Sequence, residues 1–142
     1  MYETTLDAPL LITRLSSPVT IDEIREWKAS LEREVAKIPD GGTFKLLADL
    51  RGYDFSLNAP AHQEMRVVLP LLLARHGLRT ALLDLFPEST VEVTAERGVT
   101  CTAAAYVHHN VEKMATFNEN LERPREEFST DRVAAEAWIR AR

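Results

Sequence analysis

The sequence predicts an α/β fold, a single domain in which helices pack on a central, largely parallel sheet. The length of 142 residues is that of about one domain. Hydrophobic residues make up 45% and charged residues 27% of the chain, as in ordinary globular proteins, which excludes disordered and fibrous classes. Apolar runs that suit strands alternate with amphipathic stretches that suit helices, a pattern typical of parallel sheets with helical connections.

The first half of the chain is expected to form a strand, a helix and a second strand. The run 10–15 is apolar enough for a strand, and Pro18 ends it. Residues 20–23 (Thr-Ile-Asp-Glu) have the pattern of a capping box, whose hydroxyl and carboxylate satisfy free N–H groups at a helix start. An amphipathic apolar stripe then predicts a helix up to the turn at 39–42. The nearly continuous apolar run 44–50 suits a strand covered on both faces.

A second helix is predicted after the loop that follows this strand. Asn58 can cap it, and Pro60 suits its first turn. The apolar positions from Met65 to Leu73 mark its buried face. Pro70 falls inside that run, where it removes a hydrogen bond and crowds the preceding turn at a cost of about 3 kcal/mol. We therefore expect a kink or a break of the helix at Pro70.

The segment 77–99 has a mixed pattern. Residues 78–86 suit either a strand or a helix, because a short apolar run does not distinguish the two. Residues 90–95 alternate between apolar and polar side chains, which favours a half-exposed strand.

The last third of the chain predicts two further pairs of strand and helix. Residues 100–107 read as a buried central strand whose small side chains allow close helix packing. Asn110 can cap the helix that follows. Residues 127–129 suit a short edge strand, and 131–140 suit a last helix. The expected inward side chains of these two helices are Val111, Met114, Phe117 and Leu121, then Val133, Ala134, Ala137 and Trp138.

Charge and composition exclude several classes of protein. The chain has 17 Lys and Arg against 22 Asp and Glu, a net charge of -5, which argues against a nucleic-acid binder. Its longest apolar run, 67–74, is far shorter than the ~20 residues of a membrane helix, so no membrane insertion is expected. The first residues lack the pattern of a signal peptide, and a cytoplasmic protein is expected. Because Cys101 is the only cysteine, an intramolecular disulfide or a cysteine-based zinc site is excluded.

Three motifs in the last third carry a resemblance to a known family. Residues 108–110 (His-His-Asn) follow a strand, 127–131 (Glu-Phe-Ser-Thr-Asp) include a short strand with a phenylalanine, and 135–139 (Ala-Glu-Ala-Trp-Ile) close the last helix. Together they resemble STAS-like proteins, a bacterial family of uncharacterised function with the fold of sporulation anti-sigma-factor antagonists. The resemblance implies one STAS-like domain over 1–142, in which 77–99 is an elaboration of this subgroup.

The resemblance also gives one position a special meaning. Antagonists of that superfamily carry a regulatory serine in an Asp-Ser-Ser-Gly-like stretch at the start of the second helix. A phosphate there would add roughly -2 charge to a docking surface, beside the positive end of the helix. When Phe55 is aligned with the phenylalanine that precedes this stretch, Ala59 stands at the phospho-acceptor position and Pro60 replaces the glycine. The resemblance thus implies a binding or regulatory module without the usual phosphoserine switch, and nearby Ser56 is expected to be a loop or cap residue.

Four polar residues fall at the carboxyl ends of predicted strands: Asp49, Arg51, His108 and His109. Because α/β folds place ligand sites at these ends, we expect the four to surround one shallow pocket. The two histidines are adjacent and would point to opposite faces unless the chain turns between them. A zinc site needs three or four converging ligands. We therefore expect no metal site and no cofactor.

No catalytic motif supports an enzyme. The sequence has neither a Gly-x-Ser-x-Gly elbow nor a glycine-rich phosphate loop, and Cys101 is expected to be buried and inert. Two function classes remain. The first is a non-enzymatic interaction module that docks a protein partner or a second copy of the chain, as a homodimer, through a sheet edge or through 77–99. The alternative is a binder of a small apolar or acyl-lipid ligand, held beside the kinked helix at 65–73.

Overall fold

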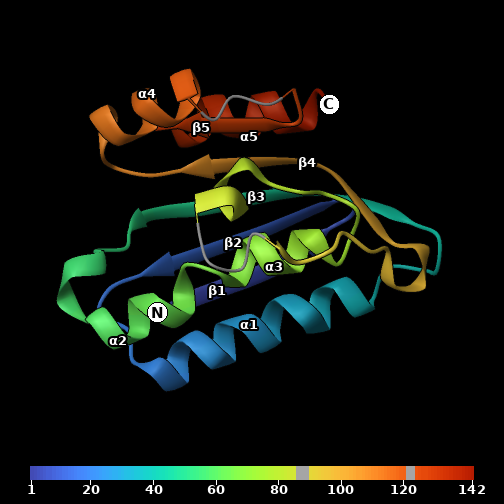
Figure 1. Cartoon of the computed structure of the whole chain (residues 1–142). Coiled ribbons are helices and arrows are strands. Elements are labelled where there is room, and N and C mark those ends of the chain that lie inside the picture. The colour runs from blue at the N-terminus through green and yellow to red at the C-terminus, as the bar shows by residue number, and fades with distance from the viewer. Residues whose placement is uncertain (86–89, 121–123) are drawn as a thin grey trace.

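The computed structural model describes residues 1–85, 90–120 and 124–142 and shows in them one five-stranded sheet (Figure 1). The first strand, β1, pairs antiparallel with β2, and all further neighbours are parallel in the order β2-β3-β4-β5. The predicted α/β class with a mostly parallel sheet is confirmed. The strands are β1 (Tyr2–Asp7), β2 (Leu10–Ser16), β3 (Thr43–Gly52), β4 (Thr100–Val107) and β5 (Glu126–Ser129).

Strand β1 lies outside the elements that the sequence predicts. Tyr2, Thr4 and Leu6 are half-buried, and the residues between them are exposed. This alternation is that of an edge strand with one face on the core. A tight turn returns the chain into β2, so β1 covers the outer edge of the first predicted strand.

Helix α1 (Ile21–Ala36) forms as the sequence predicts. The Thr20 side chain accepts the N–H of Glu23, and the Glu23 carboxylate accepts the N–H of Thr20, which completes the capping box. The apolar stripe of the helix packs against the sheet. Its Trp27 is fully buried and donates its indole N–H to Thr13 Oγ1 of β2 at 2.7 Å. This hydrogen bond satisfies the indole N–H, which would otherwise be unpaired inside the core.

The predicted kink or break of the second helix occurs as a break, which divides it into two short helices, α2 (Ala59–Met65) and α3 (Val68–Ala74). The break falls at 66–67, one turn before Pro70. Pro70 has no N–H to give to the carbonyl of Arg66, and its ring crowds that carbonyl. In the first turn of α3 the missing N–H has no helical partner to lose, so Pro70 is tolerated there. Asn58 caps α2 by accepting the N–H of Ala61 at 3.1 Å, as predicted.

The described part of 77–99 holds short 3-10 helices at Ala81–Leu85 and Glu96–Gly98. The predicted strand at 90–95 is wrong, since only Ala95 forms a single bridge, with His76. The backbone of Thr94 pairs instead with the end of α3 and the turn after it: its N–H donates to Ala74 and its carbonyl accepts from Gly77. An alternating segment forms a strand only when the edge of another strand pairs with it. The described residues 90–95 pair with no strand. Phe86, at the end of the 78–86 run, lies outside the described residues.

Helices α4 (Val111–Asn120) and α5 (Arg132–Arg140) begin where the sequence places them, after the caps Asn110 and Asp131. Their inward faces differ in part from the prediction. On α4, Met114 is buried and Phe117 partly so, but Val111 is 66% exposed. The predicted fourth member, Leu121, lies outside the described residues.

On α5, the buried residues are Ala135 and Ile139, and Trp138 is partly buried. The predicted inward positions Val133, Ala134 and Ala137 are exposed. A single turn separates Ala135 from Ile139, so this pair defines a narrow stripe that docks on the sheet. The face assignment failed because alanines at several positions make two stripes of the helix equally apolar.

The helices cover the two faces of the sheet unequally (Figure 1). Leu46 and Ala48 of β3 pack into the larger core with α1 and α3, whereas Leu47 between them packs into the smaller core with α5. Helix α4 joins the larger core through Met114. The carboxyl ends of β3 and β4 lead into the segments that carry α2 and α4, at the same end of the sheet. Among the described helices, none is long and apolar enough to cross a membrane.

Candidate functional site

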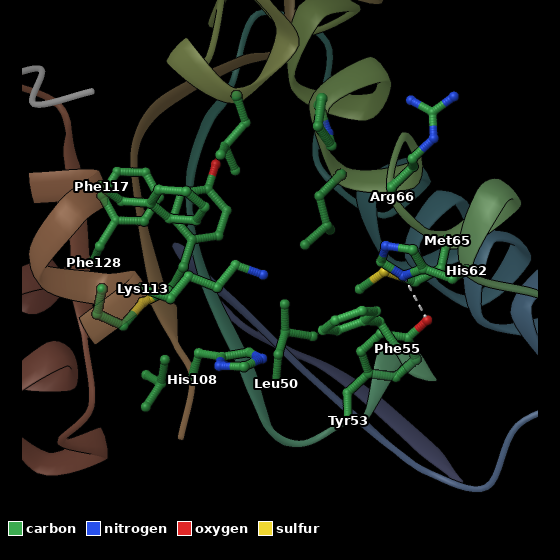
Figure 2. A pocket seen from close by; sticks show the side chains of 16 residues that line it. Leu50, Tyr53, Phe55, His62, Met65, Arg66, His108, Lys113, Phe117 and Phe128 are labelled. Atoms are coloured by element: carbon green, nitrogen blue, oxygen red, sulfur yellow. Dashed lines mark hydrogen bonds between the residues drawn. The ribbon is translucent and has the colours of Figure 1, made fainter. Parts of the chain in front are cut away.

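A cavity of about 220 Å³ lies at the carboxyl ends of β3, β4 and β5 (Figure 2). It is on the face of the sheet that carries α2, α3 and α4, and side chains of all three helices line it. Figure 2 shows Lys113 and Phe117 on one side and His62, Met65 and Arg66 on the other. Its apolar lining includes Leu50, Met65, Leu69, Met114, Phe117 and Phe128.

The polar side chains of the described residues that line this cavity include no carboxylate. They are the hydroxyls of Tyr53 and Tyr106 and the nitrogen-bearing side chains of His62, Arg66, His108 and Lys113. The Tyr106 hydroxyl donates to Glu126 at 3.4 Å. The chain as a whole has a net charge of -5, whereas the charged side chains that line the cavity, Arg66 and Lys113, are cations. Such a cavity offers an apolar surface for the body of a ligand and hydrogen-bond donors for its polar end.

His108 follows β4 directly, and its ring points into the cavity (Figure 2). Its Nδ1 accepts the backbone N–H of Asn110 at 3.1 Å, so the proton of the neutral ring is on Nε2. Burial, with Lys113 and His109 nearby, lowers the pKa of His108 to about 4. The ring is therefore neutral at pH 7 and keeps an Nε2–H donor for the cavity.

Lys113 lies in the first turn of α4, and its half-buried side chain reaches into the middle of the cavity (Figure 2). The ammonium lies 5.8 Å from the ring centroid of Phe55 and 5.5 Å from that of Phe117. It forms no ion pair with any carboxylate in the part of the chain that the structure describes. Burial lowers the pKa of Lys113, because water is partly removed from a charge that has no carboxylate beside it among the described residues.

Tyr53 and His62 form the opposite wall. The Tyr53 hydroxyl and His62 Nδ1 lie 2.9 Å apart in a hydrogen bond. Burial raises the pKa of Tyr53 to about 12, and burial together with Lys113 and Arg66 lowers the pKa of His62. At pH 7 both groups are therefore neutral. Phe55, which is 54% exposed, lies against His62 at the mouth of the cavity.

The structure places the four predicted site residues at one end of the sheet but in two different environments. Asp49 is 1% exposed and accepts hydrogen bonds from Arg51 Nε at 2.9 Å and from Arg132 at 3.3 Å. Burial acts to raise the pKa of Asp49, but the hydrogen bonds from Arg51 and Arg132 outweigh it and lower that pKa. His109 donates from Nδ1 to the carbonyl of Arg51 at 2.9 Å.

Alternation along the strands explains this separation. Leu47, Asp49 and Val107 point to the α5 face, whereas His108 follows Val107 and turns to the cavity. Asp49 and Arg51 line a separate shallow groove. The chain turns after β4, so His108 and His109 do not diverge, and their rings stack at 4.3 Å. His109 thereby contacts both environments: its ring stacks on His108, and its Nδ1 donates to the carbonyl of Arg51.

The aligned switch position lies beside the cavity. Ala59 is the exposed first residue of α2. Ser56 lies one turn earlier in the 3-10 helix Phe55–Leu57, where its hydroxyl donates to Asp54 Oδ1 at 2.6 Å. A phosphate on Ser56 would face the carboxylate of Asp54. Cys101 is buried, and burial raises its pKa to about 12.

Lys113, His62 and Tyr53 lie outside the site that the sequence predicts. The signal for Lys113 is its place in the first turn of a helix that follows a parallel strand, the region where such folds hold ligands. Tyr53 lies in the loop after β3 and His62 on α2, and the sequence has no local signal that brings the two side chains together. No cluster of three His, Cys, Asp or Glu residues that could hold a metal occurs among the described residues.

Comparisons with protein-family models, curated proteins and solved structures find no match to the chain.

Proposed function

We propose that this protein binds a small, largely apolar molecule in the cavity at the carboxyl ends of β3, β4 and β5. The observation that carries the proposal is the cavity itself: about 220 Å³ between α2–α3 and α4, lined mostly by aliphatic and aromatic side chains. Small-molecule sites in proteins have this composition, with a few polar groups that fix the orientation of the ligand. The position also agrees with the rule that open α/β sheets bind ligands beyond the carboxyl ends of their strands.

The volume sets the size of the ligand. An engineered apolar cavity of about 150 Å³ binds benzene, which corresponds to about 25 Å³ per non-hydrogen atom. On that scale a cavity of about 220 Å³ takes about nine non-hydrogen atoms. A longer molecule would have to extend past Phe55 at the mouth. The ligand class is therefore of the size of an eight-carbon chain or a small aromatic compound.

A series of primary alcohols from pentanol to decanol tests this proposal, with binding followed by isothermal titration calorimetry. Each methylene that enters an apolar cavity contributes about 0.8 kcal/mol, so Kd should fall about fourfold per carbon. The gain should end near octanol, when the cavity is full. Absence of binding to every alcohol, or an affinity independent of chain length, would overturn the proposal.

A cavity-filling variant locates the site. Leu82 is partly buried and lines the cavity, so Leu82→Trp should occupy part of its volume and weaken octanol binding by about tenfold or more. The matched control is Leu71→Trp. Leu71 is also partly exposed, but it lies on α3 in the groove next to α1. That variant should bind octanol as the wild type does, and equal losses in both variants would contradict the proposed location.

The other function expected from the sequence, a STAS-like module that docks a protein or a second copy of the chain without a phosphoserine switch, stays a prediction. It is compatible with ligand binding, because a small molecule beside Ala59 would lie next to the surface that carries the switch in antagonists. Size-exclusion chromatography with light scattering, with and without octanol, measures whether the chain self-associates.

A further inference from the structure

We propose that the occupant of this cavity is an apolar monocarboxylic acid, whose carboxylate pairs with the Lys113 ammonium and accepts the Nε2–H of His108. The inference rests on the proposed function and adds the chemical class of the head group. It starts from an imbalance of charge and hydrogen bonding: Lys113 and His108 present donors to the cavity, whereas no described lining residue supplies a carboxylate.

The first carrier of the inference is Lys113. Its ammonium is half-buried and flanked by the rings of Phe55 and Phe117, without an ion pair to any described residue. A buried cation without a carboxylate partner is costly, and an anionic ligand would remove that cost. Other cations of the chain have carboxylate partners within 4 Å, for example Arg25 with Glu64 at 2.7 Å and Lys37 with Glu34 at 2.8 Å. Lys113 differs from these cations because its partner would have to come from the cavity.

The second carrier is the fixed donor on His108. Its Nδ1 is occupied by the Asn110 N–H, so only Nε2–H faces the cavity. A donor held in this tautomer selects an acceptor atom on the ligand. An ammonium and a neutral N–H together match a carboxylate, which offers two oxygens and one negative charge.

The charge count favours a monoanion over a phosphate. Burial holds His108 neutral at pH 7, so it adds no positive charge. Arg66 donates its Nε–H to Gln63 at 3.1 Å at the rim, which leaves Lys113 as the cation that reaches the middle of the cavity. One central cation balances one carboxylate. With room for about nine non-hydrogen atoms, the cavity is close in size to octanoic acid, and 3-phenylpropanoic acid is slightly larger.

Three probes with the same eight-carbon chain test the head group: octanoate, 1-octanol and octylammonium, titrated by calorimetry at pH 7. Hydrogen bonds to charged groups contribute about 1.5–3 kcal/mol, so the wild type should bind octanoate about ten- to a hundredfold more tightly than octanol. Octylammonium should bind more weakly than octanol, because it meets the charge of Lys113. The comparison of 3-phenylpropanoate with octanoate distinguishes an aromatic from an aliphatic ligand body.

The variant Lys113→Met assigns the charge, since it keeps the length of the side chain and removes the ammonium. It should bind octanoate no more tightly than octanol, while octanol binding persists and reports an intact cavity. Lys113→Arg should restore most of the preference. The matched control, Lys28→Met, removes an exposed charge on α1 outside the cavity and should leave the preference unchanged.

The two proposals fail differently. If octanol binds but octanoate binds no better in the wild type, or if Lys113→Met keeps the full preference for octanoate, the carboxylate assignment is overturned and the apolar site stands. If neither octanol nor octanoate binds the wild type, both proposals are overturned.

Discussion

Acidification should remove a definable part of the folding free energy through His108. The pKa of this imidazole is about 4 in the folded protein, against 6.5 for an unperturbed histidine. Because the folded value is the lower one, the unfolded chain binds more protons between pH 6.5 and pH 4, and stability falls as the pH falls through this window. The contacts agree with the sign: protonation would end the hydrogen bond from the Asn110 N–H and place a second cation beside Lys113.

The magnitude follows from the separation of the two pKa values. In a site shielded from water this separation corresponds to about 3 kcal/mol. His108 is only half-buried, and solvent screening reduces the contribution to about 1–2 kcal/mol. At pH 7 none of this destabilisation is present, and at pH 4 most of it is.

Urea unfolding of the wild type and of His108→Gln at several pH values between 4 and 7 measures this contribution. The other titrating groups are common to both proteins, so the pH dependence of the difference in free energy of unfolding isolates His108. We expect the wild type to lose about 1–2 kcal/mol more than the variant on going from pH 7 to pH 4. An NMR titration of the four imidazoles, with the variant used to assign His108, gives the pKa directly. A pKa of 6.5 or above, or identical pH profiles, would refute the neutral, half-buried imidazole.

Two further predictions concern stability. Asp49→Asn should lower the free energy of unfolding by about 2–3 kcal/mol in urea, because a carboxylate that is 1% exposed loses hydrogen bonds from two arginines. The control Asp40→Asn, at an exposed pair, should change it by less than about 1 kcal/mol, and equal losses would contradict a structural role for Asp49. Gly77→Ala should cost about 2–3 kcal/mol, because φ is +77 and the new Cβ would meet Thr100 at 3.1 Å. Gly41→Ala shares the positive φ but has open space, and should cost only about 1 kcal/mol by thermal unfolding.

The strands show which part of the fold could be predicted from the sequence. Residues 90–95 alternate between apolar and polar side chains but form no strand, whereas 2–7, with polar Thr4 between Tyr2 and Leu6, form one. The edge of β2 is free to pair with 2–7, whereas the backbone at Thr94 is taken by the end of α3 and the turn after it. Local signals suffice for the capping box at 20–23 and for the buried runs of β3 and β4. They do not suffice where pairing with a segment elsewhere in the chain determines whether a strand forms.

The candidate site shows the same limit at the level of single side chains. The position at the strand ends could be predicted for Asp49 and His108, because parallel strands end together. The face on which each side chain lies depends on the register of the strand, and it separates Asp49 from the cavity. The expected neighbourhood of the helix at 65–73 does line the cavity, through Met65 and Leu69. Lys113 comes from a helix that reaches the cavity only when α4 packs beside β5.

The two polar clusters at this end of the sheet have opposite charge balance, and this difference separates stability from binding. Asp49 is held by Arg51 and Arg132, so its negative charge is compensated inside the protein. A substitution there should lower stability and leave the octanoate preference intact. Lys113 has no such partner among the described residues, and we propose that the carboxylate of the ligand compensates its charge. A substitution there should abolish the preference at little cost in stability, because removal of an unpaired half-buried charge also removes its desolvation.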